Sequence, residues 1–460
     1  MKQNGLDTMF KDKRLAVTLA VCCLVACQAP VTTLSEAELT ASAQRGNGEA
    51  QYQLAKQLAE LGKYPEAMKW MQQTVNETQR AATREMRAAA ALQVGDWYQA
   101  GLGEPKNTPA ARRWWNIASR LGKGEAGYRL GTDCQAQHQG KLVAACLDDF
   151  ETSAVKGYAP SQLIMAQWHA SRTGGEAEAV NWLQKAAERD NRDAQYQLAK
   201  RYEQGEGVAV RRDVAERWYF RSATLGQPQA QLWMAQHEDG QNALAWYQRA
   251  ATNGEPTAQL WLGKAYREGT LLSADRQKSH DWLTRAAAGG AGEANYLLSH
   301  QQTEHEGREL LLQQSSVAGY VRAQHELGDV FFKRNALERA REEYAKAAAA
   351  GDITARVAYA DMLRLGQGGK TDYVAAAKQY RLAAQSGSRM AQYRMGMMRQ
   401  DGMGVTRNRI HAYAWYAMAA TEGMNDAVHA RNDLEAVMQP DEIKAGQRLA
   451  MHWSSEKMEE

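Results

Sequence analysis

The stretch Asp193–Gly226, DAQYQLAKRYEQGEGVAVRRDVAERWYFRSATLG, decides the fold of this chain. Its apolar residues recur at spacings of three and four, first from Tyr196 to Tyr202 and again from Ala215 to Ala223. That periodicity is typical of two amphipathic helices, each with one apolar stripe. A glycine loop, Gly205 to Gly207, separates the helices, and Gly226 ends the second one. Because a single hairpin cannot bury both stripes, the stretch predicts packing against neighbouring copies of itself.

Copies of this unit run along the chain. The residue equivalent to Ala194 recurs most often after 36 residues, with steps of 28 and 29 where the glycine loop is missing. The equivalents are Ala50, Ala90, Ala126, Ser161, Ala194, Ala230, Ala258, Ala294, Ala323, Ala355, Ala391 and Ala427. A period in this range indicates a helical solenoid, in which each repeat contacts only its neighbours. We therefore expect one elongated domain without separate cores.

Fixed columns in the repeats predict how the helices pack. A small residue stands five positions after eleven of these residues, from Ala50 to Ala391, and a glycine stands four positions before most of the twelve, with Asp190 as one exception. Seven positions before that glycine the residue is large, as in Trp115, Tyr344 and Tyr416. Close packing requires large side chains to fill the space that small ones leave. The columns therefore predict a buried seam between the two helices of every repeat.

The best copy, Ala391–Gly423, reads AQYRMGMMRQDGMGVTRNRIHAYAWYAMAATEG. This pattern resembles the Sel-one-like repeat family, relatives of the tetratricopeptide repeats, and the resemblance covers roughly residues 46–430. It implies an all-α fold: a right-handed α/α superhelical solenoid of about eleven hairpin repeats. It also implies a protein–protein adaptor and not an enzyme. Residues 431–460, which depart from the repeat, are expected to form capping helices and a tail.

The amino-terminal residues predict export and lipidation. Lys11, Lys13 and Arg14 precede the apolar run 15–25, which is too short to span a bilayer and has the layout of a secretory signal. The residues Leu24 to Cys27, LVAC, resemble a bacterial lipobox, so residues 1–26 are interpreted as a lipoprotein signal peptide and Cys27 as the lipidated residue. The alternative is an ordinary signal peptide with a chance cysteine.

The resemblance to lipoproteins also suggests a location. Gln28 follows Cys27, whereas an aspartate there retains many Gram-negative lipoproteins at the inner membrane. We therefore expect a lipid-anchored protein on the periplasmic face of the outer membrane, with residues 27–45 as a tether. No later run reaches eighteen apolar residues.

Cys134 and Cys146 remain after processing, and an oxidising compartment favours a disulfide between them. In tetratricopeptide-like hairpins, their columns face one another across the two helices. The alternative, a redox or metal site, lacks CxxC spacing and a histidine pair. We expect no metal and no cofactor.

Other candidate chemistry favours structural interpretations. No strand pattern precedes the glycine loops, so they read as turns between helices and not as phosphate loops. His300 and His305 lie five residues apart, whereas a zinc-binding pair on one helix face is four apart. The formal charge of +3, which falls to +1 after cleavage before Cys27, argues against nucleic-acid binding. The chain is therefore predicted not to be an enzyme.

Candidate binding residues are those that vary between repeats. A tryptophan column eight residues before the terminal glycine reads mainly as core, and ligand stacking is the alternative; it comprises Trp114, Trp182, Trp218, Trp246, Trp282 and Trp415. Trp233 and Trp261 lie on first helices and are better candidates for an exposed concave face. Arginines near the glycine loops are further candidates, namely Arg211, Arg212, Arg399, Arg407 and Arg409.

Two functions fit these features. The lipobox, the length and the run of repeats resemble outer-membrane lipoproteins of alginate export. That resemblance implies a periplasmic scaffold that places the porin of an exopolysaccharide secretion complex and links it to periplasmic proteins. The alternative is a periplasmic module that binds the polysaccharide through the arginines and exposed aromatic residues.

Overall fold

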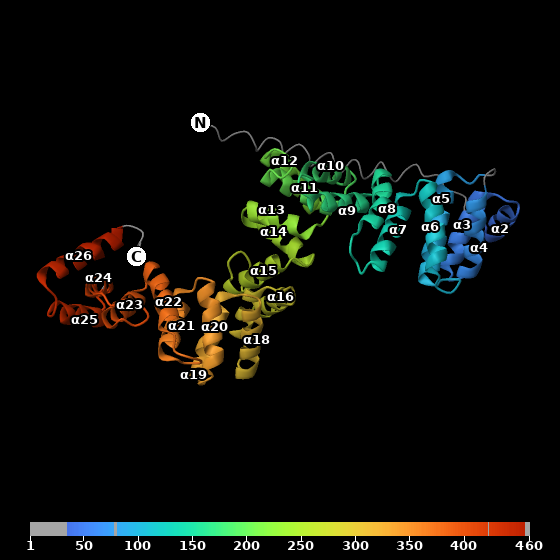
Figure 1. Cartoon of the computed structure of the whole chain (residues 1–460). Coiled ribbons are helices and arrows are strands. Elements are labelled where there is room, and N and C mark those ends of the chain that lie inside the picture. The colour runs from blue at the N-terminus through green and yellow to red at the C-terminus, as the bar shows by residue number, and fades with distance from the viewer. Residues whose placement is uncertain (1–34, 78–80, 422, 456–460) are drawn as a thin grey trace, which may run out of the picture. The chain divides into compact units, whose positions relative to one another are not determined.

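The computed structural model describes residues 35–77, 81–421 and 423–455, which form helices joined by turns, with no strand among them (Figure 1). The helices are α2 (Glu36–Gln44), α3 (Gly48–Glu60), α4 (Tyr64–Asn76), α5 (Arg84–Ala100), α6 (Thr108–Arg120), α7 (Gly124–Gln137), α8 (Ala144–Val155), α9 (Ala159–Ala170), α10 (Glu176–Ala187), α11 (Arg192–Gln204), α12 (Arg212–Thr224) and α13 (Pro228–His237). They continue as α14 (Gly240–Thr252), α15 (Pro256–Glu268), α16 (Arg276–Ala288), α17 (Gly292–Ser299), α18 (His305–Val317), α19 (Val321–Lys333), α20 (Leu337–Ala349), α21 (Ile353–Leu365), α22 (Tyr373–Gln385), α23 (Arg389–Asp401), α24 (Arg409–Ala420), α25 (Asn425–Glu435) and α26 (Pro440–Ser455). The predicted all-α fold class is confirmed.

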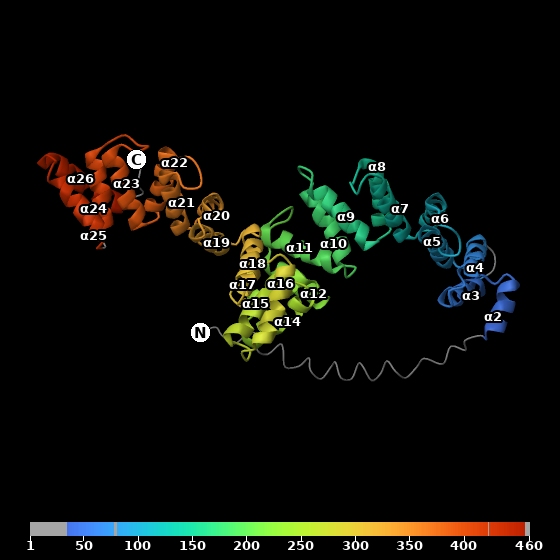
Figure 2. The same ribbon diagram turned by 90° about the horizontal axis from the view of Figure 1, so that it is seen from below.

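The chain divides into two compact units, and the boundary lies between Glu216 and Arg217, inside α12. We call the residues up to Glu216 unit 1 and the residues from Arg217 onward unit 2. This division differs from the single domain expected from the repeat period. Within each unit the packing is sequential: each helix from α2 to α11, and from α13 to α24, packs against the helices next to it in the chain (Figure 2). Such nearest-neighbour packing defines a solenoid of helical hairpins.

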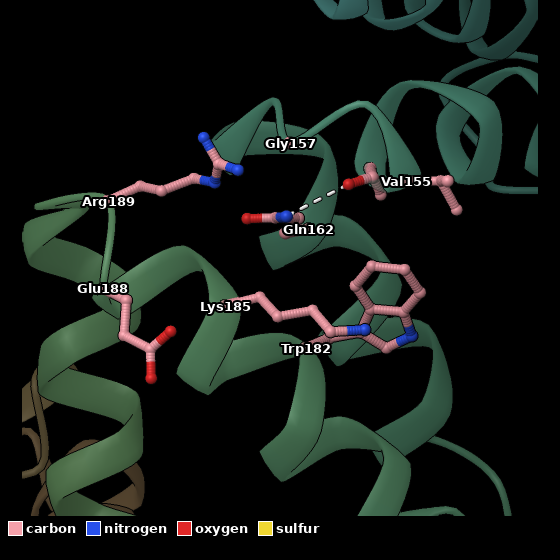
Figure 3. A pocket seen from close by; sticks show the side chains of 8 residues that line it. Val155, Gly157, Gln162, Trp182, Lys185, Glu188 and Arg189 are labelled. Carbon is pink, nitrogen blue, oxygen red and sulfur yellow. Dashed lines mark hydrogen bonds between the residues drawn. The ribbon is translucent and has the colours of Figure 1, made fainter.

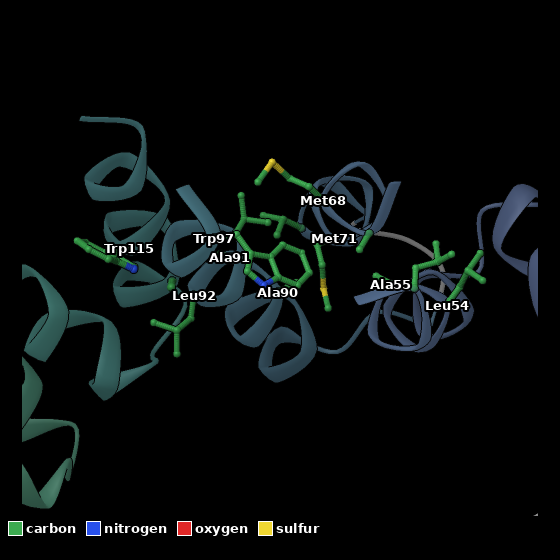
Figure 4. Close-up of a cluster of buried hydrophobic side chains, with 14 of the residues drawn as sticks. Leu54, Ala55, Met68, Met71, Ala90, Ala91, Leu92, Trp97 and Trp115 are labelled. Carbon is green, nitrogen blue, oxygen red and sulfur yellow. The ribbon is translucent and has the colours of Figure 1, made fainter. Parts of the chain in front are cut away.

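The seam inside each hairpin joins the small column to the large column, as predicted. A side chain at Gly95 would begin 2.5 Å from Trp115, and one at Gly396 would begin 2.5 Å from Tyr416. Trp115 and Tyr416 are each only 2% exposed. Figure 4 shows one core cluster, where Met68 and Met71 of α4 pack against α5. The small residues therefore let the two helices approach until the large ring fills the gap.

A glutamine column, which the repeat pattern did not single out, joins successive hairpins. Gln195 donates a hydrogen bond from Nε2 to the Ala187 carbonyl at 3.0 Å, and Gln259 donates to the Ala251 carbonyl at the same distance. Arg356 occupies the column in α21 and donates to the Ala348 carbonyl. Each acceptor lies near the carboxyl end of the preceding helix, where carbonyls lack helical partners. A buried side chain thus satisfies a helix end in the repeat before it.

The ends of the described chain differ in detail from expectation. Residues 27–45 were expected to be a tether, but Glu36–Gln44 form α2. The reason is a capping box, in which Ser35 and Glu38 each bind the other's backbone amide. At the other end, α25 and α26 both pack on α24. The tail beyond residue 455 lies outside the described residues.

Candidate interaction surfaces

Cys134 and Cys146 lie opposite each other in one hairpin, on α7 and α8. Their sulfurs are 1.99 Å apart and their Cα atoms 5.5 Å apart. Both side chains are buried against Phe150 and Met165. The structure therefore brings the two predicted cysteines together as a disulfide that links the two helices of the repeat.

His138 lies beside this disulfide, and the sequence analysis did not single it out. Its Nδ1 is 3.9 Å from both sulfurs and 2.9 Å from the Cys134 carbonyl oxygen. Among the described residues, Cys134, His138 and Cys146 form a group whose donor atoms lie within 4.8 Å of one another. Sulfurs joined in a disulfide do not offer the thiolates that a metal ion binds. The hairpin link is therefore the arrangement that this structure supports.

The tryptophan column is only partly core. Trp415 is fully buried, whereas Trp182, Trp246 and Trp282 are half-buried. A cation three residues further along the same helix covers each half-buried ring: Lys185 at 4.2 Å from the Trp182 centroid, and an arginine at 4.8 Å for the other two. Cations over indole faces are attracted by the ring quadrupole. A cation from its own helix therefore covers each of these three rings, which the spacing alone did not reveal.

Trp233 and Trp261 are not the free rings that the sequence favoured. Trp233 stacks on Tyr219 with ring centroids 4.2 Å apart, and Trp261 stacks on Tyr247 at 4.0 Å. His237 stacks on Trp233 as well, at 3.8 Å. Both tryptophans are half-buried, since the second helix of the preceding hairpin covers one face of each ring. Stacking on neighbouring rings is thus their main contact, and this weakens the expectation of a ligand platform there.

The candidate arginines remain at the surface. Arg211 and Arg212 are exposed, and Arg211 pairs with Asp213 at 3.1 Å in unit 1. Arg407 and Arg409 are exposed in unit 2. Arg211 and Arg212 lie at the start of α12, and Arg407 and Arg409 lie at the start of α24, so the four residues belong to two different repeats. These arginines remain candidates for binding a partner protein.

The glycine loops between helices hold repeats together. A Cβ on Gly404 would lie 2.2 Å from the Tyr373 carbonyl oxygen at the start of α22, and one on Gly207 would lie 2.3 Å from the Glu176 carbonyl oxygen of α10. Both glycines have positive φ, +69° and +73°. The second glycine of each loop therefore allows backbone-to-backbone contact with the preceding hairpin. This close approach gives the second glycine a structural role between hairpins.

Polar contacts to carboxylates link neighbouring helices in unit 2. Tyr380 donates to Asp361 at 2.6 Å, and Arg394 of the next repeat pairs with the same carboxylate at 3.3 Å. Tyr344 donates likewise to Asp329 at 2.6 Å. Burial, followed by the hydrogen bond to the carboxylate, raises the pKa of both tyrosines well above the usual value. These groups act as structural donors.

One pocket combines charged and aromatic groups, and we call it the α8–α10 pocket. It has a volume of about 600 Å³ and lies between α8, α9 and α10 of unit 1 (Figure 3). Its walls include Val155, Gln162, Trp182, Lys185, Glu188 and Arg189. That volume is within the range of small-molecule sites. Sequence reasoning missed this pocket because its residues come from two successive repeats.

Two sequence predictions bear on membranes. Cys27 lies outside the described residues, so the structure says nothing of its surroundings. Among the helices that are described, none has the length and apolar character needed to cross a bilayer.

Stacked hairpins with open surfaces define the class of the protein as a helical-repeat scaffold. The model of the Sel1 repeat matches residues 48–76, 88–123, 174–191, 192–227, 230–255, 256–290, 354–388 and 389–424, more than half of the chain. The chain therefore belongs to the Sel1 repeat family. Proteins of this kind are in general non-catalytic scaffolds that mediate protein–protein interactions.

The fold of one solved structure agrees with this assignment. The chain is similar to c5321, a protective antigen of uropathogenic Escherichia coli strains with an SLR fold: identity is 25%, the match covers 92% of this chain and 95% of that one, and the TM-score is 0.71. A Sel1 repeat protein from Oxalobacter formigenes is 26% identical, with 51% of this chain and 96% of that one covered and a TM-score of 0.41. The comparison with curated proteins gives no match.

Proposed function

We propose that this protein is a lipid-anchored periplasmic scaffold of the outer membrane that assembles an exopolysaccharide secretion complex. The observation that carries the proposal is the succession of a lipobox ending at Cys27 and a nearly continuous array of Sel1 repeats. In this layout the chain resembles AlgK, the outer-membrane lipoprotein of alginate export. By that resemblance its partners are the alginate porin, which it helps to place, and periplasmic proteins that act on the polymer.

Physical properties of the repeats support a scaffold. A solenoid offers a long surface whose residues vary freely between repeats, since the columns that hold it together are few. Exposed apolar side chains often mark a site where another protein docks. In unit 2 they occur at Leu365, Tyr373 and Val374. The cations Lys370 and Arg407 belong to the two loops that flank the start of α22. This mixed edge suits a protein partner with an acidic rim.

The anchor is tested by replacing Cys27 with serine. We expect the Cys27→Ser protein to appear in the soluble periplasmic fraction, while the unchanged protein stays with outer membranes, because the acyl chains supply the membrane affinity. Cys134→Ser serves as the control, since that cysteine lies in the buried hairpin. Membrane attachment of the Cys27→Ser protein would contradict the anchoring proposal.

The scaffold role is tested by crosslinking intact cells and purifying the protein from their envelopes. We expect a porin and periplasmic proteins to be recovered with it. The second candidate function, a polysaccharide-binding module, is favoured by the exposed cations Arg211, Arg212, Arg407 and Arg409. Recovery of polymer without proteins, together with direct binding by the purified protein, would favour that function over the scaffold.

A further inference from the structure

We propose that the α8–α10 pocket binds an acidic sugar residue, a uronate, of the secreted polymer. The choice of polymer rests on the proposed function, whereas the chemistry rests on the pocket itself. Through this site the scaffold would bind the secreted polysaccharide directly.

The pocket presents two cations. Arg189 lies at the end of α10, with its guanidinium over Gly157: a Cβ there would be 2.5 Å from Nη2. Within the described part of the chain, Arg189 has neither an ion pair nor a side-chain hydrogen bond. The Lys185 ammonium sits 4.2 Å from the centroid of the Trp182 ring, which holds it at the pocket wall (Figure 3). A carboxylate entering the pocket would gain charge-assisted hydrogen bonds from both groups.

The same pocket also presents acceptors. Gln162 is 3% exposed; its Nε2 donates to the Ala154 carbonyl at 3.0 Å, and its Oε1 has no partner. In Figure 3 that oxygen points away from the dashed hydrogen bond of Gln162, toward the side where Arg189 lies. The Glu188 carboxylate, which accepts one bond from Gln184 at 3.0 Å, lines the pocket as well. Hydroxyl groups are the natural donors to such oxygens.

Comparison with other repeats separates this pocket from ordinary packing. The side-chain oxygen Oε1 also lacks a hydrogen-bond partner at Gln51, Gln195 and Gln324. The unpaired Oε1 of Gln162 alone therefore does not distinguish this pocket. Directly after α14, the residue equivalent to Arg189 is Asn253, which donates to Gln231 Oε1 at 2.8 Å and so gives that oxygen a partner. In α8 the equivalent Lys156 donates to the Ser119 carbonyl at 2.6 Å. Arg189 instead leaves its guanidinium and the nearby Gln162 oxygen both unused.

The combination selects the ligand class. Two cations alone would accept any carboxylate, and an acidic peptide would satisfy them. The acceptor oxygens of Gln162 and Glu188 favour a ligand that also carries several hydroxyl donors. The indole of Trp182 supplies an aromatic edge suited to a sugar ring. A uronate carries hydroxyls and a carboxylate on one ring. The volume of about 600 Å³ accommodates a ring of that size with room for water.

The test uses the full-length protein in detergent and an oligouronate of six residues, with binding followed by calorimetry. We expect Arg189→Ala and Lys185→Ala each to weaken binding about tenfold or more, because each removes a charge-assisted contact. Arg285→Ala is the matched control: it also removes a cation over a tryptophan, at 4.8 Å, but the residue equivalent to Arg189 there is Gly289. We expect Arg285→Ala to bind as the unchanged protein does.

Other ligands decide between classes. A hexasaccharide with its carboxyls reduced to alcohols is expected to lose most of the affinity. Oligoglutamate binding that is as tight and as dependent on Arg189 would overturn the sugar assignment in favour of an acidic peptide. Unchanged oligouronate binding by Arg189→Ala would contradict the proposal that the α8–α10 pocket is the binding site.

The crosslinking experiment repeated with Arg189→Ala separates this inference from the scaffold proposal. Recovery of the porin and periplasmic proteins is expected to stay normal, while oligouronate binding falls. If the variant loses its protein partners and keeps the sugar, the pocket is a protein-docking site and the inference is wrong. Circular dichroism of the variant establishes that the helices are retained.

Discussion

Gly404 shows how one residue can decide the spacing of two hairpins. Its φ of +69° is strained for residues with a side chain, and its Cα faces the Tyr373 carbonyl of the hairpin before it. Gly387 has a similar φ of +88° with nothing within 4 Å of a built Cβ. The two glycines therefore separate the cost of backbone conformation from the cost of a close approach.

We expect Gly404→Ala to lower the free energy of unfolding by about 3 kcal/mol, because conformational strain and a steric clash add. Gly387→Ala is expected to cost about 1 kcal/mol, from conformation alone. Urea unfolding followed by circular dichroism measures both. Equal losses in the two variants would contradict the proposed role of the loop contact.

Tyr380 illustrates a buried donor whose titration affects stability. Its pKa is raised above the ordinary value of about 10 by burial and by the hydrogen bond to Asp361. The folded state therefore keeps this proton more tightly than the unfolded state does. Its contribution to stability is complete below about pH 10 and is lost as the pH rises through the folded pKa.

We accordingly expect the free energy of unfolding to fall between pH 9 and pH 11, and Tyr380→Phe to make that fall smaller. The variant is also expected to lose about 1 kcal/mol at pH 8, the value of one buried hydrogen bond. Urea titrations at the three pH values provide the measurement. Tyr373→Phe, which removes the hydroxyl of an exposed ring, is the control and should leave the stability at pH 8 unchanged.

At the scale of the element, the α7–α8 hairpin has a covalent link in addition to its packed seam. The disulfide closes a loop between residues 12 apart, and both sulfurs lie in the core beside Phe150. Restricting the unfolded chain by a loop of this size stabilises the folded state.

We expect the double variant Cys134→Ser, Cys146→Ser to be destabilised by about 3 kcal/mol. Reducing agent should destabilise the unchanged protein similarly and leave the double variant unaffected. Thermal unfolding with and without reductant tests this. Mass spectrometry of non-reduced protein that finds two free thiols would show the link to be absent.

At the scale of the whole molecule, contacts run from each helix to its neighbours in the chain, so a local loss is expected to stay local. The carboxyl-terminal cap provides the test. Trp453 of α26 is 3% exposed and its ring lies 4.7 Å from that of Trp415 in α24. Met451, two residues earlier, is 63% exposed.

We expect Trp453→Ala to cost about 3–5 kcal/mol in the last repeats, because a large buried side chain is removed. Met451→Ala should change stability by less than about 0.5 kcal/mol. Hydrogen exchange should show lost protection in α24 and α26 and unchanged protection in α15 and α16 of the same unit. A uniform loss throughout unit 2 would indicate that the unit unfolds as one.

The repeat columns made much of the fold predictable. Small and large residues at fixed spacing predicted the seam of Gly95 with Trp115, and the terminal glycines predicted the left-handed helix ends, including Asp190 with a φ of +56°. The glutamine column recurs in seven of the twelve repeats, but a polar residue on a helix does not reveal whether it is buried. The capping box at Ser35 was also readable and was overlooked in the expectation of a tether.

The sequence by itself determined the hairpins, their period and the residues of each seam, because local periodicity and nearest-neighbour packing involve residues close in the chain. Only the tertiary structure decided which tryptophans are covered, which glutamine oxygen is unpartnered, and that Arg189 and Lys185 face one pocket with Gln162. Those properties depend on how one repeat lies on the next. Small differences in side chains at that junction, such as arginine in place of asparagine, determine whether the space is filled or left open to a ligand.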